Sequence, residues 1–257
     1  VNKHFLNMFD GSDWSGRPNI GWNFSRDQPD ALAVCSACHL PTVAADDPIV
    51  EAPSRASGIT REGIHCDFCH KIADTALRRE PQFLGLTHGR DALRLVRPAG
   101  EQQIFFGPLD DVDGGRDTFS PLYRSSYYCA SCHEGTLFGT KAYETFSEWA
   151  ASSYARRGVE CQHCHMKPDG TTRNIAPGHG GIDRDPNTLS THHFPGSMDE
   201  FFLRSSVELT LEAHLADRAV RATATVRSVN VGHRLPTGAP ERHLLLIVRA
   251  TDEHGNV

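Results

Sequence analysis

The sequence predicts a loop-rich, mainly α-helical domain with little regular structure over residues 1–205, followed by a small antiparallel β domain over residues 206–257. Three observations lead to this fold class. All eight cysteines lie in four copies of one pentapeptide, Cys-x-x-Cys-His, and these copies end at residue 165. The same region holds many glycines and prolines, whereas alternation of apolar and polar residues begins only after residue 206.

The four pentapeptides indicate covalent attachment of a prosthetic group. Two thiols three positions apart can bond the two vinyl groups of a haem, and the histidine that follows can reach the iron as its proximal ligand. We therefore expect four haem c groups, each with one iron. The expected anchors are Cys35, Cys38, Cys66, Cys69, Cys129, Cys132, Cys161 and Cys164, and the expected proximal ligands are His39, His70, His133 and His165.

Two other uses of paired cysteines explain the pattern less well. Four Cys-x-x-Cys pairs could hold two structural zinc ions, or they could form four disulfides. Neither explains a histidine after every second cysteine. Disulfides that close such short loops would also leave distant parts of the chain without a covalent link. Haems that pack side by side can also replace much of a side-chain core, which accounts for the expected scarcity of regular structure.

The pentapeptides are arranged as a repeat. The first two begin 31 positions apart and the last two 32 positions apart, and the sequences around the two pairs align at offsets of 94 to 95 residues. A duplicated dihaem unit, over about residues 31–71 and 125–167, accounts for both facts. In each unit a glycine, Gly63 or Gly158, precedes the second motif, where it permits a backbone turn close to the porphyrin; an ordinary turn is the alternative.

The hydrophobic pattern predicts several elements. Tyr143, Phe146, Trp149, Ala150 and Tyr154 form a helical stripe that leads into the fourth motif, and a second helix is expected near residues 198–206. Residues 207–213 and 220–226 alternate as two antiparallel strands, with the bend near Asp217 and Arg218. A third strand is expected over residues 244–251. The turn signal after it implies a return strand, so the sheet is expected to be completed by another chain or by further sequence.

Distal ligands are expected to be histidines, because the chain has eleven histidines outside the proximal positions and only three methionines. Two strong nitrogen ligands close the iron to substrates. His233 lies in a loop bracketed by glycine and proline that can hold its ring over a haem. His192 and His193 form the next site, with one ring as ligand and His192 preferred.

The remaining distal positions are left open by the sequence. His65 is held beside one haem by Cys66 and could ligate the neighbouring iron, and His163 has the same geometry with less support. His4, His88 and His179 compete for the last site, whereas three histidines on or beside the expected strands are interpreted as surface residues: His214, His243 and His254.

Charge and hydropathy exclude some partners. The formal net charge is −6, with acidic and basic residues interspersed, so no nucleic-acid partner is expected. The longest apolar run, residues 244–248, is far shorter than the roughly 20 residues of a membrane-spanning helix. The chain begins at Val1 without a recognisable leader, so either a signal peptide has been removed or the numbering starts inside a longer precursor. Both fit an exported protein, and we expect a periplasmic or extracellular location.

Several segments resemble those of multihaem c-type cytochromes of the tetrahaem, extracytoplasmic electron-transfer type. They are residues 63–71, 143–149, 161–166, 192–196 and 232–238. The resemblance covers most of the chain and implies a haem domain followed by a β-rich domain, bis-histidine irons, and His192 and His233 as distal ligands. Related chains often carry a further histidine upstream of Val1, which leaves the fourth distal ligand open. Some relatives polymerise into extracellular filaments in which a neighbour supplies a ligand.

The function expected from these features is electron transfer rather than catalysis, between redox partner proteins or to an extracellular electron acceptor. The alternatives are a multihaem reductase of nitrite, hydroxylamine or a sulfur compound with one open iron, or the electron-transfer subunit of an enzyme complex. No motif has lysine in place of its final histidine, and spare histidines are plentiful, so the carrier is favoured. A homopolymer is a further possible assembly.

Overall fold

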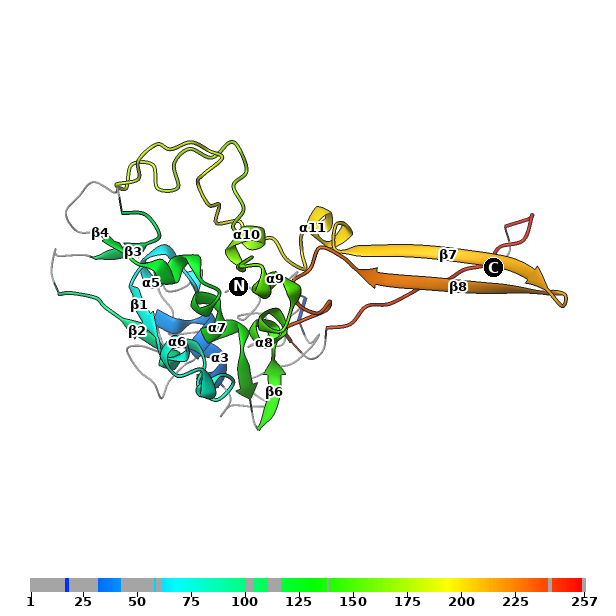
Figure 1. Ribbon diagram of the computed structural model, residues 1–257, viewed down its shortest axis with the longest axis horizontal. Helices are drawn as coiled ribbons and strands as arrows, with labels where there is room; N and C mark the ends of the chain where they lie inside the picture. Colours follow the sequence, from blue (N-terminus) through cyan, green and yellow to red (C-terminus); the bar gives the residue numbers. More distant parts are fainter. Residues whose placement is uncertain are drawn as a thin grey trace.

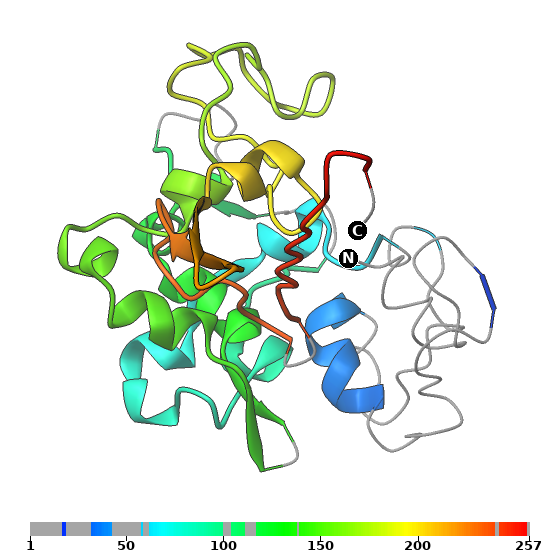
Figure 2. The same ribbon diagram turned by 90° about the vertical axis from the view of Figure 1, so that its right-hand side faces the viewer.

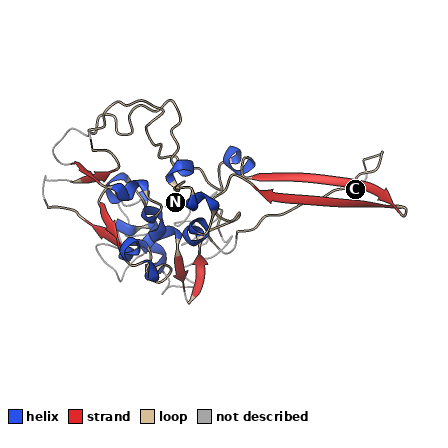
Figure 3. Cartoon of the chain, viewed as in Figure 1, coloured by secondary structure: helices blue, strands red, loops and turns tan. Residues whose placement is uncertain are grey.

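The computed structural model describes residues 17–18, 32–42, 58, 62–99, 104–110, 117–137, 139–239 and 242–255. In these ranges the chain forms a body of short helices and small sheets, from which one long β-hairpin projects (Figure 1). Loops connect almost every pair of elements, and the longest described loop joins α10 to α11 (Figure 3). The prediction of many loops, short helices and small antiparallel sheets is confirmed, whereas the order of the two domains and their boundary near residue 205 stay predictions.

The helices are short, because the sequence interrupts each of them with a capping residue, glycine or proline within two turns. The longest described helix has eight residues. The α-helices are α3 (Leu32–His39), α5 (Cys66–Cys69), α6 (Ala76–Arg79), α7 (Tyr127–His133), α8 (Thr145–Ala150), α9 (Ser153–Arg156), α10 (Gln162–His165) and α11 (Glu200–Arg204). The 3-10 helices are η4 (Pro81–Phe83), η5 (Gly89–Ala92) and η6 (Pro121–Arg124). None of the described helices is long and apolar enough to cross a bilayer.

The described strands pair two by two. Three pairs are antiparallel: β1 (Ile72–Thr75) with β2 (Leu93–Leu95), β5 (Gly135–Leu137) with β6 (Thr140–Tyr143), and β7 (Val207–Ala216) with β8 (Ala219–Ser228). The fourth pair, β3 (Phe105–Gly107) with β4 (Asp117–Phe119), is parallel. The pairs β1–β2, β3–β4 and β5–β6 are thus short two-stranded sheets that connect neighbouring loops.

Two small apolar clusters lie beside the motif helices. One contains Leu77, Ala130 and Phe146, with Tyr127 and Trp149 packed against it. The other contains Phe68, Ile72 and Leu122, with Tyr123 and Tyr128 at its edge. Phe68 belongs to α5 and Ala130 to α7. The apolar side chains of these two clusters therefore pack against both helices.

The helical stripe over residues 143–154 forms two helices instead of one. Tyr143 ends β6, α8 ends at Ala150, and Ser152 then caps α9 by accepting hydrogen bonds from the backbone amides of Tyr154 and Ala155. A serine hydroxyl that satisfies the free amides of a new helix is the physical reason for this break. The second predicted helix is present as α11, which Asp199 caps in the same way.

The hairpin follows the predicted alternation and extends it to ten residues per strand. Asp217 and Arg218 both have positive φ, 51° and 63°, which is the two-residue turn that matches the twist of the strands. One face pairs Leu209 with Val226 and is exposed. The opposite face is polar.

The prediction of a third strand over residues 244–251 is wrong for the described structure. Residues 242–255 extend in the same direction as the hairpin but have no regular secondary structure (Figure 1). Viewed from the tip of the hairpin, this segment lies apart from β7 and β8 (Figure 2). Leu245 and Ile247 are 79% and 70% exposed. The apolar pattern reports only a propensity, and a strand also needs a partner edge within hydrogen-bonding reach.

Candidate haem sites

Each Cys-x-x-Cys-His motif lies on a short helix. His39, His133 and His165 are the last residues of α3, α7 and α10, and His70 is the C-cap of α5. Residues three and four positions apart share one face of a helix. The two thiols and the imidazole of each motif therefore project to the same side, which is the geometry that attachment of a haem edge and ligation of its iron require.

The repeat is visible in the backbone before the second motif of each unit. Gly63 and Gly158 stand three residues before Cys66 and Cys161, and both have positive φ, 73° and 69°. Glycine adopts this conformation without the steric cost that a Cβ imposes. The prediction of a glycine turn at these two positions is confirmed, and its closeness to a porphyrin stays a prediction.

Thiol contacts link the motifs to one another. Cys38 and Cys132 form a hydrogen bond that raises the pKa of Cys38 and lowers that of Cys132. A second such bond between Cys129 and Cys161 raises the pKa of Cys129 and lowers that of Cys161. These contacts bring the first motif against the third, and the third against the fourth.

Two pairs of histidine rings lie at the separation that one metal ion would span. The ring centroids of His165 and His233 are 6.2 Å apart, with planes 16° from parallel. Those of His70 and His192 are 6.3 Å apart, with planes at 32°. A metal–nitrogen bond of about 2.0 Å, plus about 1.1 Å from that nitrogen to the ring centre, gives about 6.2 Å for two imidazoles on one metal. The residues present therefore fit a six-coordinate haem iron at both places.

Backbone carbonyls orient three of these rings. Nδ1 of His70 lies 2.6 Å from the carbonyl oxygen of Phe106, and Nδ1 of His165 lies 2.8 Å from that of Pro195. Nδ1 of His233 lies 2.8 Å from the carbonyl oxygen of Arg234. A carbonyl can only accept, so Nδ1 carries the proton and the Nε2 lone pair is left for a metal.

Burial favours the neutral form of two of the paired imidazoles. It lowers the pKa of His165, and it lowers the pKa of His192. The ligand form of histidine is the neutral one. The charge state of both rings therefore agrees with their geometry.

His65 is engaged differently from the role expected for it. Its Nδ1 accepts a hydrogen bond from the backbone amide of Phe68 over 3.3 Å, and its Nε2 lies 2.9 Å from Oγ1 of Thr42. The residue before a helix is well placed to cap it. Both ring nitrogens thus contact α5 and residue 42, and the role of His65 as a distal ligand stays a prediction.

The remaining candidates differ in their surroundings. His193 is exposed, with Nε2 3.9 Å from the carboxylate of Asp169, and His163 accepts a hydrogen bond from the amide of Glu160. His4 lies outside the described residues. Four histidines are exposed on loops or strands, as expected for three of them: His179, His214, His243 and His254.

His88 is the candidate that the sequence could not distinguish from its competitors. It is half-buried, and its Nδ1 has no hydrogen-bond partner among the described residues. The next residue, Gly89, packs on the backbone of Ala37 in the first motif, and Gly135, just after the third motif, lies against the His88 side chain. His88 therefore lies between the first and third motifs, a position that no local pattern signals.

The described residues contain no cluster of three or more His, Cys, Asp or Glu side chains that could hold a metal ion by itself. A structural zinc site needs four such ligands around one ion. What the described motifs and histidine pairs offer is two ligands on opposite sides of one ion, which suits an iron whose other four ligands come from a macrocycle.

Comparisons with known proteins give one similar structure. No protein-family model matches the sequence, and no curated protein matches it significantly. The crystal structure of a penta-heme cytochrome c552 from Thermochromatium tepidum matches with a TM-score of 0.57 and 21% sequence identity. The match covers 80% of this chain and 53% of that cytochrome, so the chain spans about half of its length. The fold of the described chain thus resembles that of a multihaem cytochrome.

Proposed function

We propose that this protein transfers electrons through four covalently bound haem c groups. The observation that carries the proposal is the pair of imidazole couples, His70 with His192 and His165 with His233, each at the spacing of two ligands on one iron. The four motifs and the multihaem fold of the structural neighbour support it. Bis-histidine ligation closes the iron to substrates, which favours a carrier over a reductase.

The cysteines and histidines have different roles in this proposal. The eight cysteines hold the haem edges, and His39, His70, His133 and His165 ligate the irons from the proximal side. His192 and His233 ligate two of the irons from the distal side. When bound, the haem supplies the reversible one-electron chemistry, and the chain contributes spacing, ligation and dielectric.

The order of the haems follows from the thiol contacts. Cys38 contacts Cys132, and Cys129 contacts Cys161, so haems attached to these cysteines would be held with the first beside the third and the third beside the fourth. The hydroxyl of Tyr128, the residue before Cys129, donates to the carbonyl of Cys69 over 3.2 Å and links the second motif to the third. Electrons can therefore pass between adjacent edges in single tunnelling steps.

Distal ligands for the first and third haems are a further part of the proposal. His88 is the described candidate for one of them, because it lies between the two motifs and the position of Gly89 against Ala37 holds it there. His4 stays the candidate from the sequence. We further propose an exported protein, periplasmic or extracellular, that exchanges electrons with protein partners or an extracellular acceptor.

Optical and electron paramagnetic resonance spectra test the proposal. We expect four haems per chain, and low-spin signals with histidine ligation at the second and fourth motifs. Carbon monoxide added to the reduced protein should leave these two haems unchanged. A carbon-monoxide-binding haem at either site, together with turnover of nitrite, hydroxylamine or a sulfur compound, would overturn the carrier in favour of a reductase.

A further inference from the structure

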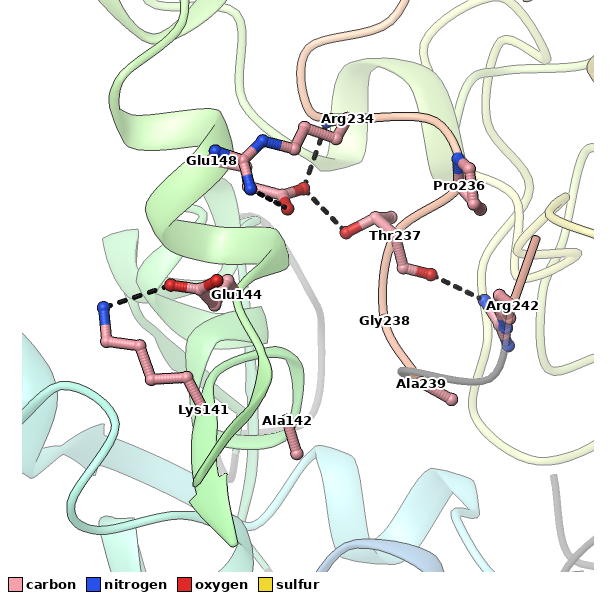
Figure 4. A pocket seen from close by; sticks show the side chains of 10 residues that line it. All are labelled: Lys141, Ala142, Glu144, Glu148, Arg234, Pro236, Thr237, Gly238, Ala239 and Arg242. Atoms are coloured by element: carbon pink, nitrogen blue, oxygen red, sulfur yellow. Dashed lines mark hydrogen bonds and ion pairs between the residues drawn. The ribbon is translucent and has the colours of Figure 1, made fainter. Parts of the chain in front are cut away.

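Glu148 lies beneath the loop that carries His233. One carboxylate oxygen, Oε2, accepts hydrogen bonds from the backbone amide of Arg234 over 3.1 Å and from the hydroxyl of Thr237 over 2.7 Å (Figure 4). The other oxygen, Oε1, lies 3.7 Å from the guanidinium group of Arg234. The Glu148 side chain is only 12% exposed, so these contacts are largely shielded from water.

The peptide of Arg234 connects this carboxylate to the imidazole of His233. The Arg234 amide donates to Glu148, and the Arg234 carbonyl accepts from Nδ1 of His233 over 2.8 Å. The Glu148 carboxylate therefore fixes the position of the Arg234 carbonyl, and this carbonyl fixes the orientation of the His233 ring. Displacing the peptide would turn Nε2 of His233 away from His165, whose ring centroid is 6.2 Å away.

The loop has little other support in the described structure. Residues 229–239 have no regular secondary structure. The hydroxyls of Thr145 and Thr237 lie 2.9 Å apart, and Gly232 packs closely on Tyr154 and Trp149. Thr145, Glu148 and Trp149 all belong to α8, so this helix contacts the loop through three of its residues.

The same helix is tied to the fourth motif. The indole nitrogen of Trp149 donates to the carbonyl of Val159 over 2.9 Å, two residues before Cys161. α8 thus contacts both the segment that carries the proximal His165 and the loop that carries the distal His233. A carboxylate on α8 can therefore hold the loop of His233 in a fixed position relative to the segment of His165, so that both could ligate one iron.

We propose that Glu148 is a positioning residue for His233 and thereby fixes the distal ligation of the fourth haem. The inference rests on the proposed bis-histidine ligation. A carboxylate suits the task because a charged acceptor forms stronger hydrogen bonds than a neutral one, and because one oxygen can receive two donors.

The cavity beside the loop provides a matched control. It has a volume of about 230 Å³ and is lined on one side by Glu144 and Glu148, and on the other by the loop (Figure 4). The Glu144 carboxylate accepts from Nζ of Lys141 over 3.0 Å, at the start of α8. Glu144→Ala therefore removes a carboxylate from the same cavity without breaking the Glu148 contacts with Arg234 and Thr237.

The test uses the full haem-loaded chain and four variants: His233→Ala, Glu148→Ala, Glu148→Gln and Glu144→Ala. The readouts are the fraction of reduced haem that binds carbon monoxide and the high-spin signal of the oxidised protein. His233→Ala should open one haem completely. Glu148→Ala should raise the carbon-monoxide-reactive fraction roughly tenfold or more, since it removes two charge-assisted hydrogen bonds.

Glu148→Gln should have a smaller effect, because the amide oxygen can still accept both hydrogen bonds. Glu144→Ala should match the wild type. If His233→Ala opens a haem and both Glu148 variants do not, the positioning role is overturned while the ligation stands. If His233→Ala changes no haem, the ligation itself fails.

A variant that fails to accumulate does not prevent a decision. Thr237→Val removes one hydrogen bond to Glu148 and leaves the carboxylate and the Arg234 amide in place. It should raise the carbon-monoxide-reactive fraction less than Glu148→Ala does. A wild-type spectrum in both Thr237→Val and Glu148→Gln would overturn the inference, as would a rise that Glu144→Ala reproduces.

Discussion

The backbone amide of Ser126 donates to the carboxylate of Glu160 over 2.7 Å, and the Ser126 hydroxyl accepts from the amide of Cys161 over 2.9 Å. Ser126 directly precedes α7 and Glu160 stands two residues before α10. The two bonds therefore join the starts of the two motif helices in the second unit. Gln162 adds to this link by donating to the carbonyls of Tyr123 and Ser125.

Removing the Ser126 hydroxyl should destabilise the protein. Ser126 is fully buried, so Ser126→Ala leaves the Cys161 amide without its acceptor, at a cost of about 1–3 kcal/mol in the free energy of unfolding. Denaturant unfolding of the haem-loaded protein measures the loss. Ser205→Ala is the control, because that exposed hydroxyl donates only to the carbonyl of Phe202 and its loss should cost less than about 0.5 kcal/mol. Equal losses would contradict this account.

Neighbouring histidines should differ sharply when each is replaced. His192→Ala should convert the second haem to a high-spin, carbon-monoxide-binding form, because the His192 ring faces His70 at 6.3 Å. His193→Ala should leave every haem low-spin, because the His193 side chain is 76% exposed and points toward Asp169. Magnetic resonance and carbon monoxide difference spectra of the two variants decide the matter. The reverse result would assign the ligand to His193.

Two glycines with similar backbone conformations should respond differently to alanine. Gly89 and Gly158 have φ values of 60° and 69°. A Cβ on Gly89 would lie 2.6 Å from the carbonyl oxygen of Ala37, whereas one on Gly158 would meet nothing within 4 Å. Gly158→Ala should therefore cost only the conformational strain of about 1–2 kcal/mol.

Gly89→Ala should cost more than Gly158→Ala and should also lower the haem content of the first motif, because Ala37 stands between Cys35 and Cys38. The pyridine haemochrome assay and thermal unfolding measure the two effects. A Gly89→Ala protein with full haem content and the stability of Gly158→Ala would show that α3 can move away from η5 at little cost.

Tyr123 should make the stability fall at alkaline pH. Burial raises its pKa above the ordinary value, and its hydroxyl donates to the carbonyls of Cys69 and Ile72. Above the unfolded pKa of about 10, the unfolded chain loses this proton while the folded chain keeps it, so the free energy of unfolding decreases as the pH rises.

Tyr123→Phe should flatten that decrease while costing about 1 kcal/mol at neutral pH for the lost hydrogen bonds. Unfolding curves at about pH 8 and pH 11 separate the two effects. Tyr128 also has a raised pKa through burial, so some of the slope should persist in the single variant and vanish in the double variant. An unchanged slope in Tyr123→Phe would mean that other groups cause the alkaline loss.

Prediction from the sequence worked where the information is local. The strands β7 and β8 follow from period-two alternation, and Gly63 and Gly158 mark the turns before two motifs. Prediction worked less well where the structure of a segment depends on its contacts with other residues. Residues 244–251 carry an apolar pattern but have no strand pairing in the described structure, and Ser152 divides the expected helix in two.

The sequence by itself indicated haem c as the cofactor and the atoms that could anchor it, because two thiols and an imidazole within five residues are a property of one helical turn. Only the tertiary structure decided which histidines meet. His165 and His233 are 68 positions apart, and His70 and His192 are 122 positions apart. Hydrogen bonds to distant segments, such as that of His70 to the carbonyl of Phe106 and that of His165 to the carbonyl of Pro195, orient these rings, and such contacts exist only once the chain has folded.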